Sequence, residues 1–390
     1  MKNIIVIADD ITGAAEIAGI AFKHGLQVRL LCCSATSVAN SVGSATSAAE
    51  VTVLATDTRG MTEQEAVAET HHLTKQITSL FTPPLGGGGA GVVLFKKTDS
   101  ALRGHVVAEL EAIIADTPYE RALYIPANPS KGRTIRNGIY YVGDRPISDT
   151  DFSFDPEFPA TTSSMADRFA HGEEKGICWC DATSMEDIRR AVAATDLSTT
   201  LLAGAADLFT AFLSSISSPR PSETGKGEGT KLSSLLFVCG STQSKPLDLG
   251  IPICQMPLEV YEQQADAEAW AAALTEEQNR QPSHSLMLTI PHHHRTGKEI
   301  AVYLRTVMGK VVQRLVENHP PKELIIEGGA TAWQILQQLG WKNFNITDEI
   351  APGVVRMHAI GTDTYVTMKP GSYPWGDLNK ILSLDKAKKN

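Results

Sequence analysis

The chain has few cysteines, and none of them is spaced to form a metal-binding or redox motif. It contains six in 390 residues, with no C-x-x-C pair and no histidine at the spacing of a zinc finger. Three of them lie in or beside apolar, strand-like runs, where a thiol usually packs as a small hydrophobic group. The cysteines therefore predict no zinc site, and we expect a reduced protein.

Long apolar runs and an excess of basic residues are also missing. No hydrophobic stretch approaches the length that spans a bilayer, and the first residues enter a strand without a charged region or a cleavage site. Lysine and arginine number 35 against 44 aspartates and glutamates, a net charge of −9, which argues against general nucleic-acid binding. We therefore expect a cytoplasmic protein with no membrane or nucleic-acid partner.

Three patterns hint at nucleotide or metal sites but fail the structural conditions for them. Gly297-Lys298 lacks the leading glycine of a Walker loop and is followed by Glu299. The glycines of 86–91 match G-x-G-x-x-G, yet they precede a strand instead of following one. The histidines 292–294 are consecutive, so on a strand their side chains alternate between faces and cannot converge on one ion. We predict no metal site here, and no G-x-S-x-G elbow occurs either.

The chain does contain two successive series of strand–helix units. At 390 residues it is too long for one ordinary core, and its 42% hydrophobic and 20% charged residues are normal for a globular protein. Residues 217–231 change sharply to Ser, Pro, Gly and charge, which is typical of a linker. We expect an α/β protein with two domains, 1–216 and 232–390, each built on a mainly parallel sheet flanked by helices.

The first strand and helix define the predicted substrate site. Ile4 to Ile7 form a β-branched run that leads into Asp9 and Asp10, and residues 11–24 have the apolar period of a helix that ends at Gly25. In an open parallel sheet, ligands collect where the strands end. We expect the two carboxylates to lie on the floor of a substrate site.

Polar clusters follow other predicted strands of the first half in the same way. The strand 51–55 runs into Thr56-Asp57-Thr58-Arg59-Gly60, and the strand 92–95 runs into 96–100, with Arg103 close behind. Basic side chains and helix N–H groups at such a strand end suit a carboxylate or a phosphate. The alternative for the second cluster is a capped, solvated turn.

The remaining elements of the first half are predicted from apolar period and turn residues. A Thr62–Glu65 capping box opens one helix, and two prolines, a glycine and two bases make residues 126–134 a stiff, positively charged loop. The segment 138–158 could form a hairpin or a lid over the site. The expected strands are 26–33 and 123–125, and the expected helices are 62–80, 106–115 and 185–193.

In the second half, a glycine pair and a lysine stand at strand ends. Gly328-Gly329 lie between a strand and a helix, where backbone N–H groups can close on a phosphate. Lys369 precedes a glycine loop beyond the last strand and can contact phosphates too. The expected strands are 235–239, 286–290, 323–326 and 365–368, and the expected helices are 267–278 with Asp266 as cap, 298–317 and 332–339.

Taken together, these motifs resemble the four-carbon acid sugar kinase family, long described as a domain of unknown function. The similarity lies in Ala8-Asp9-Asp10-x-Thr12-Gly13-Ala14, Thr56-Asp57-Thr58-Arg59 and Lys97-Thr98-Asp99-Ser100-x-Leu102-Arg103-Gly104 in the first half. In the second half it lies in Gly240-Ser241, Gly328-Gly329-x-Thr331-Ala332, Pro352-Gly353-Val354 and Lys369-Pro370-Gly371. The resemblance spans nearly the whole chain, and the first and third motifs are specific together.

The resemblance implies an ATP-dependent kinase that phosphorylates threonate, erythronate or an oxo-tetronate. The N-terminal domain would hold the acid and the C-terminal domain ATP with Mg²⁺, around an active site in the inter-domain cleft. Apart from the resemblance, a homodimer is the expected assembly if the chain associates, because two-fold dimers are the commonest soluble homo-oligomers. The implied substrate residues are Asp9, Arg59, Lys97, Thr98, Asp99, Ser100 and Arg103. The implied nucleotide residues are Ser241, Gly328, Gly329, Ala330, Thr331, Lys369 and Gly371.

In the expected mechanism, Arg59 and Lys97 clamp the substrate carboxylate while Asp99 and Ser100 bond its hydroxyls. Either Asp9 or Asp10 is the catalytic base that accepts the proton of the attacking hydroxyl, and the other caps the helix or organises a metal. Phosphoryl transfer asks mainly for positioning and charge neutralisation, which these groups supply. The alternatives are a non-catalytic sugar-acid or nucleotide sensor on the same scaffold, and another α/β transferase acting on a different small anion.

Overall fold

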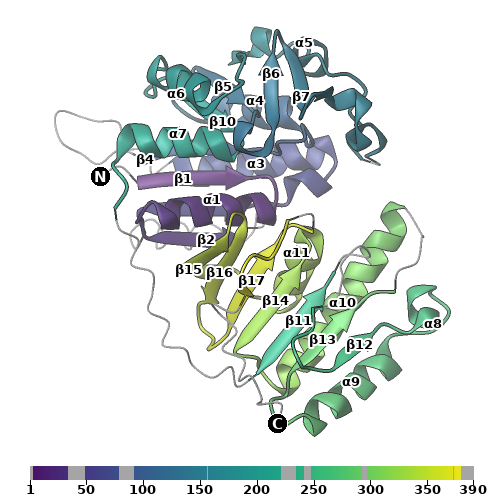
Figure 1. Ribbon diagram of the computed structural model, residues 1–390. Coiled ribbons are helices and arrows are strands. Elements are labelled where there is room, and N and C mark those ends of the chain that lie inside the picture. The colour runs from purple at the N-terminus through teal and green to yellow at the C-terminus, as the bar shows by residue number, and fades with distance from the viewer. Residues whose placement is uncertain are drawn as a thin grey trace. The chain divides into compact units, whose positions relative to one another are not determined.

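The computed structural model describes residues 3–33, 49–78, 92–155, 157–220, 234–240, 247–291, 297–371 and 373–378. The chain divides into two compact units, Met1–Ser222 and Glu223–Asn390. The division falls inside 217–231, the segment predicted as a linker. Each unit is an α/β structure with a mainly parallel sheet flanked by helices, as expected from the sequence (Figure 1).

The first unit alternates strands with helices through most of its length. Its strands are β1 Asn3–Ala8, β2 Val28–Cys32, β3 Val51–Ala55, β4 Val92–Lys97, β5 Arg121–Ile125, β6 Arg133–Arg136, β7 Ile139–Val142, β8 Arg145–Pro146, β9 Ile177–Cys178 and β10 Thr200–Gly204. Its α-helices are α1 Ile11–Lys23, α3 Glu63–Thr78, α4 Val106–Asp116, α5 Met165–Arg168, α6 Met185–Ala193 and α7 Ala206–Ile216. Short 3₁₀ helices are η1 Thr58–Gly60, η2 Pro129–Lys131, η3 Ile147–Asp149, η4 Asp151–Phe154 and η5 Glu173–Lys175.

The main sheet of this unit has the order β2-β3-β1-β4-β10-β5-β9, and all of its pairings are parallel. Helices α1 and α7 cover one face and α3 and α4 cover the other (Figure 1). Because both faces are covered, the strands are apolar on both sides, and β3 and β10 are buried along their whole length. In register, Ala8 of β1 lies beside Ala55 and Lys97, so these three strands end at one level.

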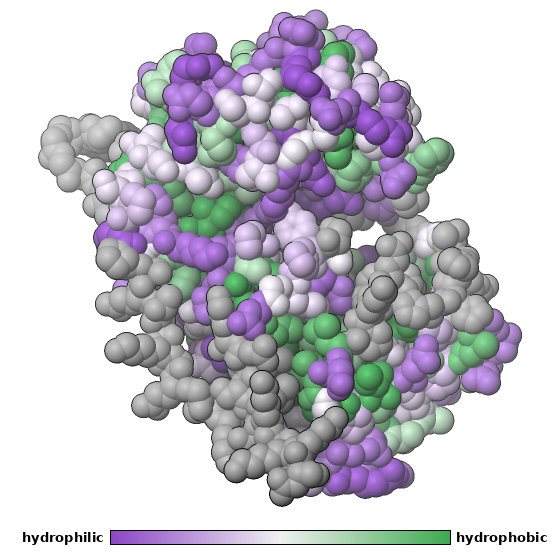
Figure 2. Space-filling view, viewed as in Figure 1, coloured by the Kyte–Doolittle hydropathy of each residue, from purple (hydrophilic) through white to green (hydrophobic). Residues whose placement is uncertain are grey.

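A separate three-stranded antiparallel sheet, β6-β7-β8, follows the fifth strand of the first unit. It accounts for part of the segment 138–158 that was predicted as a hairpin or a lid. Tyr140 of β7 is fully buried, and its hydroxyl lies 2.6 Å from the carbonyl of Ser100 and 3.1 Å from that of Pro126. The small sheet is therefore packed against the carboxyl ends of β4 and β5. Figure 2 shows hydrophilic side chains over α5 and α6, on the outer surface of this unit.

The second unit repeats the strand–helix pattern and then adds a hairpin. Its strands are β11 Leu235–Cys239, β12 Ile253–Gln255, β13 Leu286–Thr289, β14 Glu323–Glu327, β15 Asn343–Ala351, β16 Val354–Ala359 and β17 Tyr365–Lys369. Its helices are α8 Leu258–Tyr261, α9 Glu268–Arg280, α10 Lys298–Asn318 and α11 Gly329–Gln338. The strand order is β12-β13-β11-β14-β17-β16-β15, parallel from β12 to β17 and antiparallel for β17-β16 and β16-β15.

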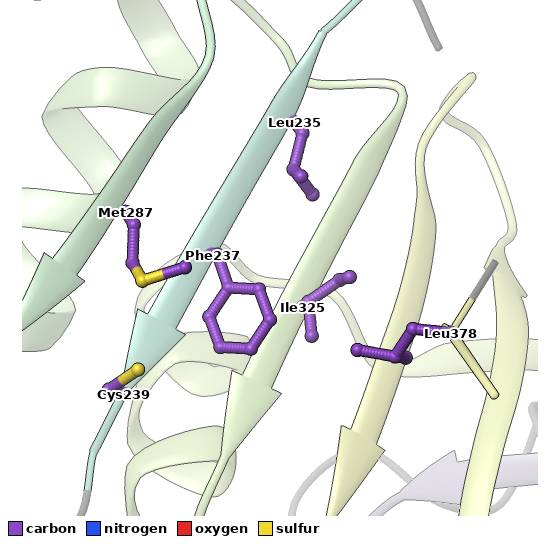
Figure 3. Packing of buried hydrophobic residues seen from close by; sticks show 6 residues of the cluster. All are labelled: Leu235, Phe237, Cys239, Met287, Ile325 and Leu378. Carbon is purple, nitrogen blue, oxygen red and sulfur yellow. The ribbon is translucent and has the colours of Figure 1, made fainter. Parts of the chain in front are cut away.

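One face of this sheet carries an apolar cluster that the last described residues close. Leu378, at the C-terminal end of the described chain, is only 7% exposed and packs with side chains of β11, β13 and β14. Trp375 packs edge-to-face on the Phe237 ring, with the centroids 5.3 Å apart. Leu378 and Trp375, which follow β17, thus belong to the core of their unit. The cluster shown in Figure 3 consists of Leu235, Phe237, Cys239, Met287, Ile325 and Leu378.

The predicted elements are present, but some of their ends were placed wrongly. The strand predicted over 92–95 continues through Lys97, because both of its lysines find buried acidic partners. The helix predicted from Ala332 begins at Gly329, and α9 begins at Glu268, so that Asp266 lies one residue before the N-cap position. The hairpin of β15 and β16 was not predicted. The Thr62–Glu65 capping box is confirmed, with both backbone N–H groups bonded to the partner's side chain.

Candidate active site

Both sheets contain a point at which the strand order reverses, and the predicted site residues of each unit lie there. In the first unit the chain leaves β1 toward β2 but leaves β3 toward β4, on the other side of β1. In the second unit the chain leaves β11 toward β12, on one side of β11, but leaves β13 toward β14, on the other side of β11. Ligands of open α/β sheets bind beyond the carboxyl ends of the strands at such a reversal.

Asp9 and Arg59 form the centre of the site in the first unit. Asp9 directly follows β1, is 2% exposed, and accepts two hydrogen bonds from the Arg59 fork, Nε to Oδ2 at 3.1 Å and Nη2 to Oδ1 at 2.9 Å. The Arg59 backbone N–H donates to the Asp9 carbonyl as well. Arg59 also lies 3.0 Å from Asp10 and 3.9 Å from Asp99. One guanidinium therefore holds three carboxylates from the ends of β1 and β4.

Asp10 has a different structural role from its neighbour. It is the N-cap of α1, with Oδ1 accepting from the Gly13 N–H at 2.8 Å and Oδ2 accepting from the Thr12 hydroxyl at 2.5 Å. A Cβ on Gly13 would lie 2.6 Å from the Asp10 carboxylate and 3.1 Å from Lys97 Nζ. The glycine of this motif is therefore needed because two charged groups close over it.

The two aspartates differ in acidity for physical reasons. Burial raises the pKa of Asp9, and the opposing charge of Arg59 does not cancel the effect. Burial also acts on Asp10, but Arg59, Lys97 and the hydrogen bonds from Thr12 and Gly13 outweigh it, so the pKa of Asp10 is lowered. Asp9 is therefore the better proton acceptor of the pair, and Asp10 is held as a charged cap.

The two lysines at the end of β4 have separate partners. Lys96 Nζ lies 2.5 Å from Glu109 of α4, which also accepts from the Thr58 hydroxyl at 2.9 Å. Lys97 Nζ donates to the Thr98 carbonyl at 3.0 Å and lies 3.5 Å from Glu16 of α1. Both lysines are less than 5% exposed. Successive strand residues point to opposite faces, which explains why neighbouring lysines reach helices on different sides of the sheet.

Asp99 and Arg103 close the turn that follows β4. Arg103 Nε donates to Asp99 Oδ2 at 2.8 Å, and the same oxygen accepts from the Ala101 N–H at 3.0 Å. Burial opposes ionisation, but Arg59 and Arg103 hold the pKa of Asp99 far below its ordinary range. The turn ends at Gly104, whose φ is +96° and where a Cβ would lie 3.3 Å from Asp9 Oδ2. This turn therefore lies directly against the Asp9 carboxylate.

Most of the predicted substrate residues therefore lie together. Asp9, Arg59, Asp99 and Arg103 form one chain of contacts, and Lys97 borders it through Gly13. Thr98 continues β4 with its N–H bonded to the Gly204 carbonyl, and the Ser100 hydroxyl accepts a hydrogen bond from Arg133. Whether Arg59 and Lys97 clamp a substrate carboxylate stays a prediction.

Several charged residues of this region were not assigned from the sequence. Glu16 on α1 contacts Lys131 as well as Lys97, and Arg133 reaches Ser100 from the start of β6. The charge of the 126–134 loop was a signal for the two basic residues. Glu16 and Glu109 gave none, because each sits on a helix and pairs with a strand lysine at no recognisable sequence spacing.

In the second unit, glycines allow the ends of β11 and β14 to approach one another. A Cβ on Gly240 would lie 2.3 Å from Thr331 Oγ1 and 2.6 Å from the Glu327 carbonyl, so no larger residue fits there. Gly328 has φ +102° and is the N-cap of α11, and its N–H donates to the Lys369 carbonyl at 3.0 Å. Gly329, Ala330 and Thr331 form the first turn of α11, whose N–H groups have no carbonyl partner within a helix. That turn is suited to an anion.

Lys369, the last residue of β17, is buried beside the glycines. Its Nζ lies 2.6 Å from Glu327 and 3.2 Å from each of the Pro370 and Gly371 carbonyls, and it sits 4.9 Å from the centre of the Trp375 ring. The lysine therefore fixes the glycine loop as well as neutralising Glu327. The thiol of Cys239 lies nearby, where burial and the Glu327 charge raise its pKa to about 12.

Some predicted features lie outside the described residues. These are Ser241, the expected partner of Gly240 in nucleotide binding, and the histidines 292–294. In the part of the chain that is described, no three His, Cys, Asp or Glu side chains are grouped to hold a metal ion. Within that same part, no helix combines the length and the apolar character needed to cross a membrane.

Comparison with known families places a separate domain on each unit. A sugar-binding N-terminal domain matches residues 4–172, and a nucleotide-binding C-terminal domain matches residues 251–373. The first match contains the Asp9–Arg59 cluster, and the second contains Gly328, Gly329 and Lys369, while β11 and Gly240 precede it. The first strand-order reversal thus lies within the match to a sugar-binding domain, and β14 and α11, on one side of the second reversal, lie within the match to a nucleotide-binding domain.

Proteins of known activity and structure resemble the chain over most of its length. D-threonate kinase of Bordetella bronchiseptica is 27% identical over 379 residues, which cover 90% of this chain and 88% of that protein. 3-oxo-tetronate kinase of Actinobacillus succinogenes is 22% identical over 415 residues, covering 94% and 96%. A crystal structure of a Haemophilus influenzae DUF1537 protein has a TM-score of 0.68 at 20% identity, covering 97% and 99%, which shows the same fold.

Proposed function

Because the chain belongs to the four-carbon acid sugar kinase family, we propose that it transfers the γ-phosphate of ATP to a hydroxyl group of a four-carbon sugar acid. The observation that carries the proposal is the pair of strand-order reversals. One bears an acidic cluster organised by Arg59 in the sugar-binding domain, and the other bears a glycine and helix N-terminus site in the nucleotide-binding domain. Kinases need both parts, a base beside the acceptor hydroxyl and a cradle for the phosphates.

In this proposal Asp9 is the base. Its buried carboxylate has a raised pKa, and proton transfer is most effective when the pKa of the base approaches the working pH. Arg59 holds both oxygens of Asp9 in a fixed orientation. Asp10 contributes by fixing α1 and by holding Arg59 from a second side.

The nucleotide phosphates are proposed to bind at the first turn of α11, next to Gly240 and Gly328. The backbone can approach closely there, and the helix dipole favours negative charge. Mg²⁺ usually keeps several waters and binds through one or two carboxylates and the substrate phosphates. Asp10 and Glu327 are the carboxylates beside the two sites that would suit such a role, and the ion would neutralise phosphate charge. That acid and nucleotide meet in a cleft between the domains remains a prediction.

The direct test measures ADP release from Mg-ATP in the presence of candidate acceptors. The panel contains D- and L-threonate, D- and L-erythronate and their 2-oxo and 3-oxo relatives, with threitol and erythritol as neutral controls. We expect turnover with one of the acids and little with the neutral compounds. If ATP raises the melting temperature of the protein but no acid produces ADP, the kinase proposal is wrong.

A further inference from the structure

Arg59 is poorly placed to receive the carboxylate of a sugar acid. Its Nε and Nη2 already donate to Asp9, its Nη2 also lies 3.0 Å from Asp10, and its Nη1 lies 3.9 Å from Asp99. A substrate carboxylate at this guanidinium would enter a group of three like charges, which repel it at short range in a buried site. Arg59 therefore organises the acids, and the substrate carboxylate needs another cation.

Arg133, the first residue of β6, provides that cation. Its Nη1 donates to the Ser100 hydroxyl, and its guanidinium lies 5.3 Å from the centre of the Phe152 ring. Among the described residues, no carboxylate lies within ion-pair distance of the Arg133 guanidinium. The remaining N–H groups of this side chain have no hydrogen-bond partner among those residues either. The guanidinium is only partly buried. It keeps a planar fork available, which is the geometry that binds a carboxylate through two parallel bonds.

The loop that carries Arg133 is held rigidly. Asn128 and Arg133 exchange backbone hydrogen bonds of 2.8 and 3.1 Å, and the buried Asn128 amide oxygen accepts from the Asp207 N–H. Ser130 donates to the Asp207 carboxylate through both its N–H and its hydroxyl, each at 2.8 Å. The loop is thus fixed to the start of α7, so Arg133 is positioned before any ligand arrives.

We infer that Arg133 binds the carboxylate of the sugar acid and is the residue by which the protein distinguishes an acid from a neutral four-carbon polyol. The inference rests on the proposed function. The acid would lie with its carboxylate at Arg133, its middle hydroxyls near Ser100, and the reacting hydroxyl at Asp9. The two arginines then have separate roles: Arg133 binds the substrate carboxylate, and Arg59 orients Asp9, the base.

The test compares Arg133→Ala with Arg136→Ala in the full chain. Arg136 lies on the same strand but stacks on Tyr141, with its guanidinium 3.9 Å from the ring centre, and contacts no site residue. We expect Arg133→Ala to raise KM for the preferred acid by about tenfold to 150-fold, the loss of a charge-assisted pair. We expect KM for ATP and kcat/KM for threitol or erythritol to stay near wild type. Arg133→Lys should be intermediate, because it keeps the charge but not the fork.

Calorimetric binding of the same acid without nucleotide separates this inference from the proposed function. If wild type phosphorylates an acid and Arg133→Ala keeps its KM and acid affinity, the kinase stands and the role of Arg133 is wrong. If Arg133→Ala lost acid and polyol turnover equally, its role would be merely structural and the inference would be overturned. The same conclusion would follow if Arg136→Ala raised KM for the acid as much as Arg133→Ala does. If wild type neither binds nor phosphorylates any acid, the proposed function fails and this inference fails with it.

Discussion

At the scale of single residues, adjacent identical side chains perform different tasks. Asp9 and Asp10 are neighbours in the chain, yet one is buried against Arg59 and the other caps α1. Lys96 and Lys97 are neighbours too, and they pair with acids on helices of opposite faces. In each pair the direction of the backbone, not the residue type, decides which role the side chain takes.

The two aspartates should separate in a mutational comparison. Asp9→Asn should lower kcat by about 10²–10⁴-fold, because the amide cannot accept the proton. Asp10→Asn should affect kcat less and should fold normally, because asparagine caps a helix as well as aspartate does. Asp10→Ala should lose about 1 kcal/mol of unfolding free energy. Steady-state kinetics and thermal unfolding of the three variants provide the measurement.

The pH dependence of kcat/KM is a second test of the assignment of Asp9 as the base. Because burial raises the pKa of Asp9, its carboxylate takes up a proton at a higher pH than an exposed aspartate does. The acidic limb of kcat/KM should therefore have its midpoint above 3.8, the ordinary value for aspartate. Asp9→Asn should lose that limb. An unchanged limb in this variant would assign the proton to another group.

At the scale of the elements, the ends of strands determine what chemistry each unit can hold. In the first unit, strand ends carry charged side chains that neutralise one another. In the second, glycines directly follow β11 and β14, so the backbone can approach a ligand closely there. The difference suits a small polyhydroxy acid in one case and a phosphate chain in the other.

Gly240→Ala tests the close approach at the end of β11. The added Cβ would lie 2.3 Å from Thr331 Oγ1 and 2.6 Å from a backbone carbonyl, so β11 and α11 must move apart. We expect a loss of about 1–3 kcal/mol in unfolding free energy and a weaker thermal shift with ATP. Urea unfolding and ATP titration measure these effects. Gly309→Ala is a suitable comparison, because its Cβ would meet the Gln334 side chain at 3.2 Å, away from the strand ends. If Gly240→Ala and Gly309→Ala gave the same thermal shift with ATP, the proposed nucleotide site would be contradicted.

The sequence predicted the strand ends better than the partners found there. Apolar runs such as 51–55 and 235–239 gave β3 and β11 without error, because a strand covered on both faces is continuously apolar. Lys96 and Lys97 seemed to lie beyond their strand, because their buried partners stand on helices, Glu109 on α4 and Glu16 on α1, and no local spacing in the sequence indicates these pairs. The β15–β16 hairpin was missed because its polar residues interrupt the apolar pattern. Arg133 was missed because its loop was read only as charged.

At the scale of the whole molecule, each unit has a sheet and an apolar core of its own. The first is built around strands such as β1 and β4, and the second includes the cluster that Leu378 closes. Compact units with separate cores generally fold on their own. The proposed acid and nucleotide sites should therefore be separable by dividing the chain.

Fragments 1–222 and 223–390, produced separately, test this independence. We expect each fragment to unfold cooperatively, the first to bind the acid and the second to bind ATP. Neither fragment alone should release ADP when ATP and the acid are both supplied. Circular dichroism with thermal unfolding and calorimetry make the comparison, with the intact chain as the control. A fragment that remains unfolded would show that its core depends on the other unit.

The position of Trp375 has a spectroscopic consequence. Its indole contacts both the Phe237 ring and the Lys369 ammonium, and the Lys369 carbonyl accepts a hydrogen bond from the N–H of Gly328. Indole emission depends on the electric field across the ring, and the Lys369 ammonium, 4.9 Å from the ring centre, contributes to that field. The protein thus carries a built-in fluorophore beside its proposed phosphate cradle, able to report the arrival of a polyanion without any attached dye.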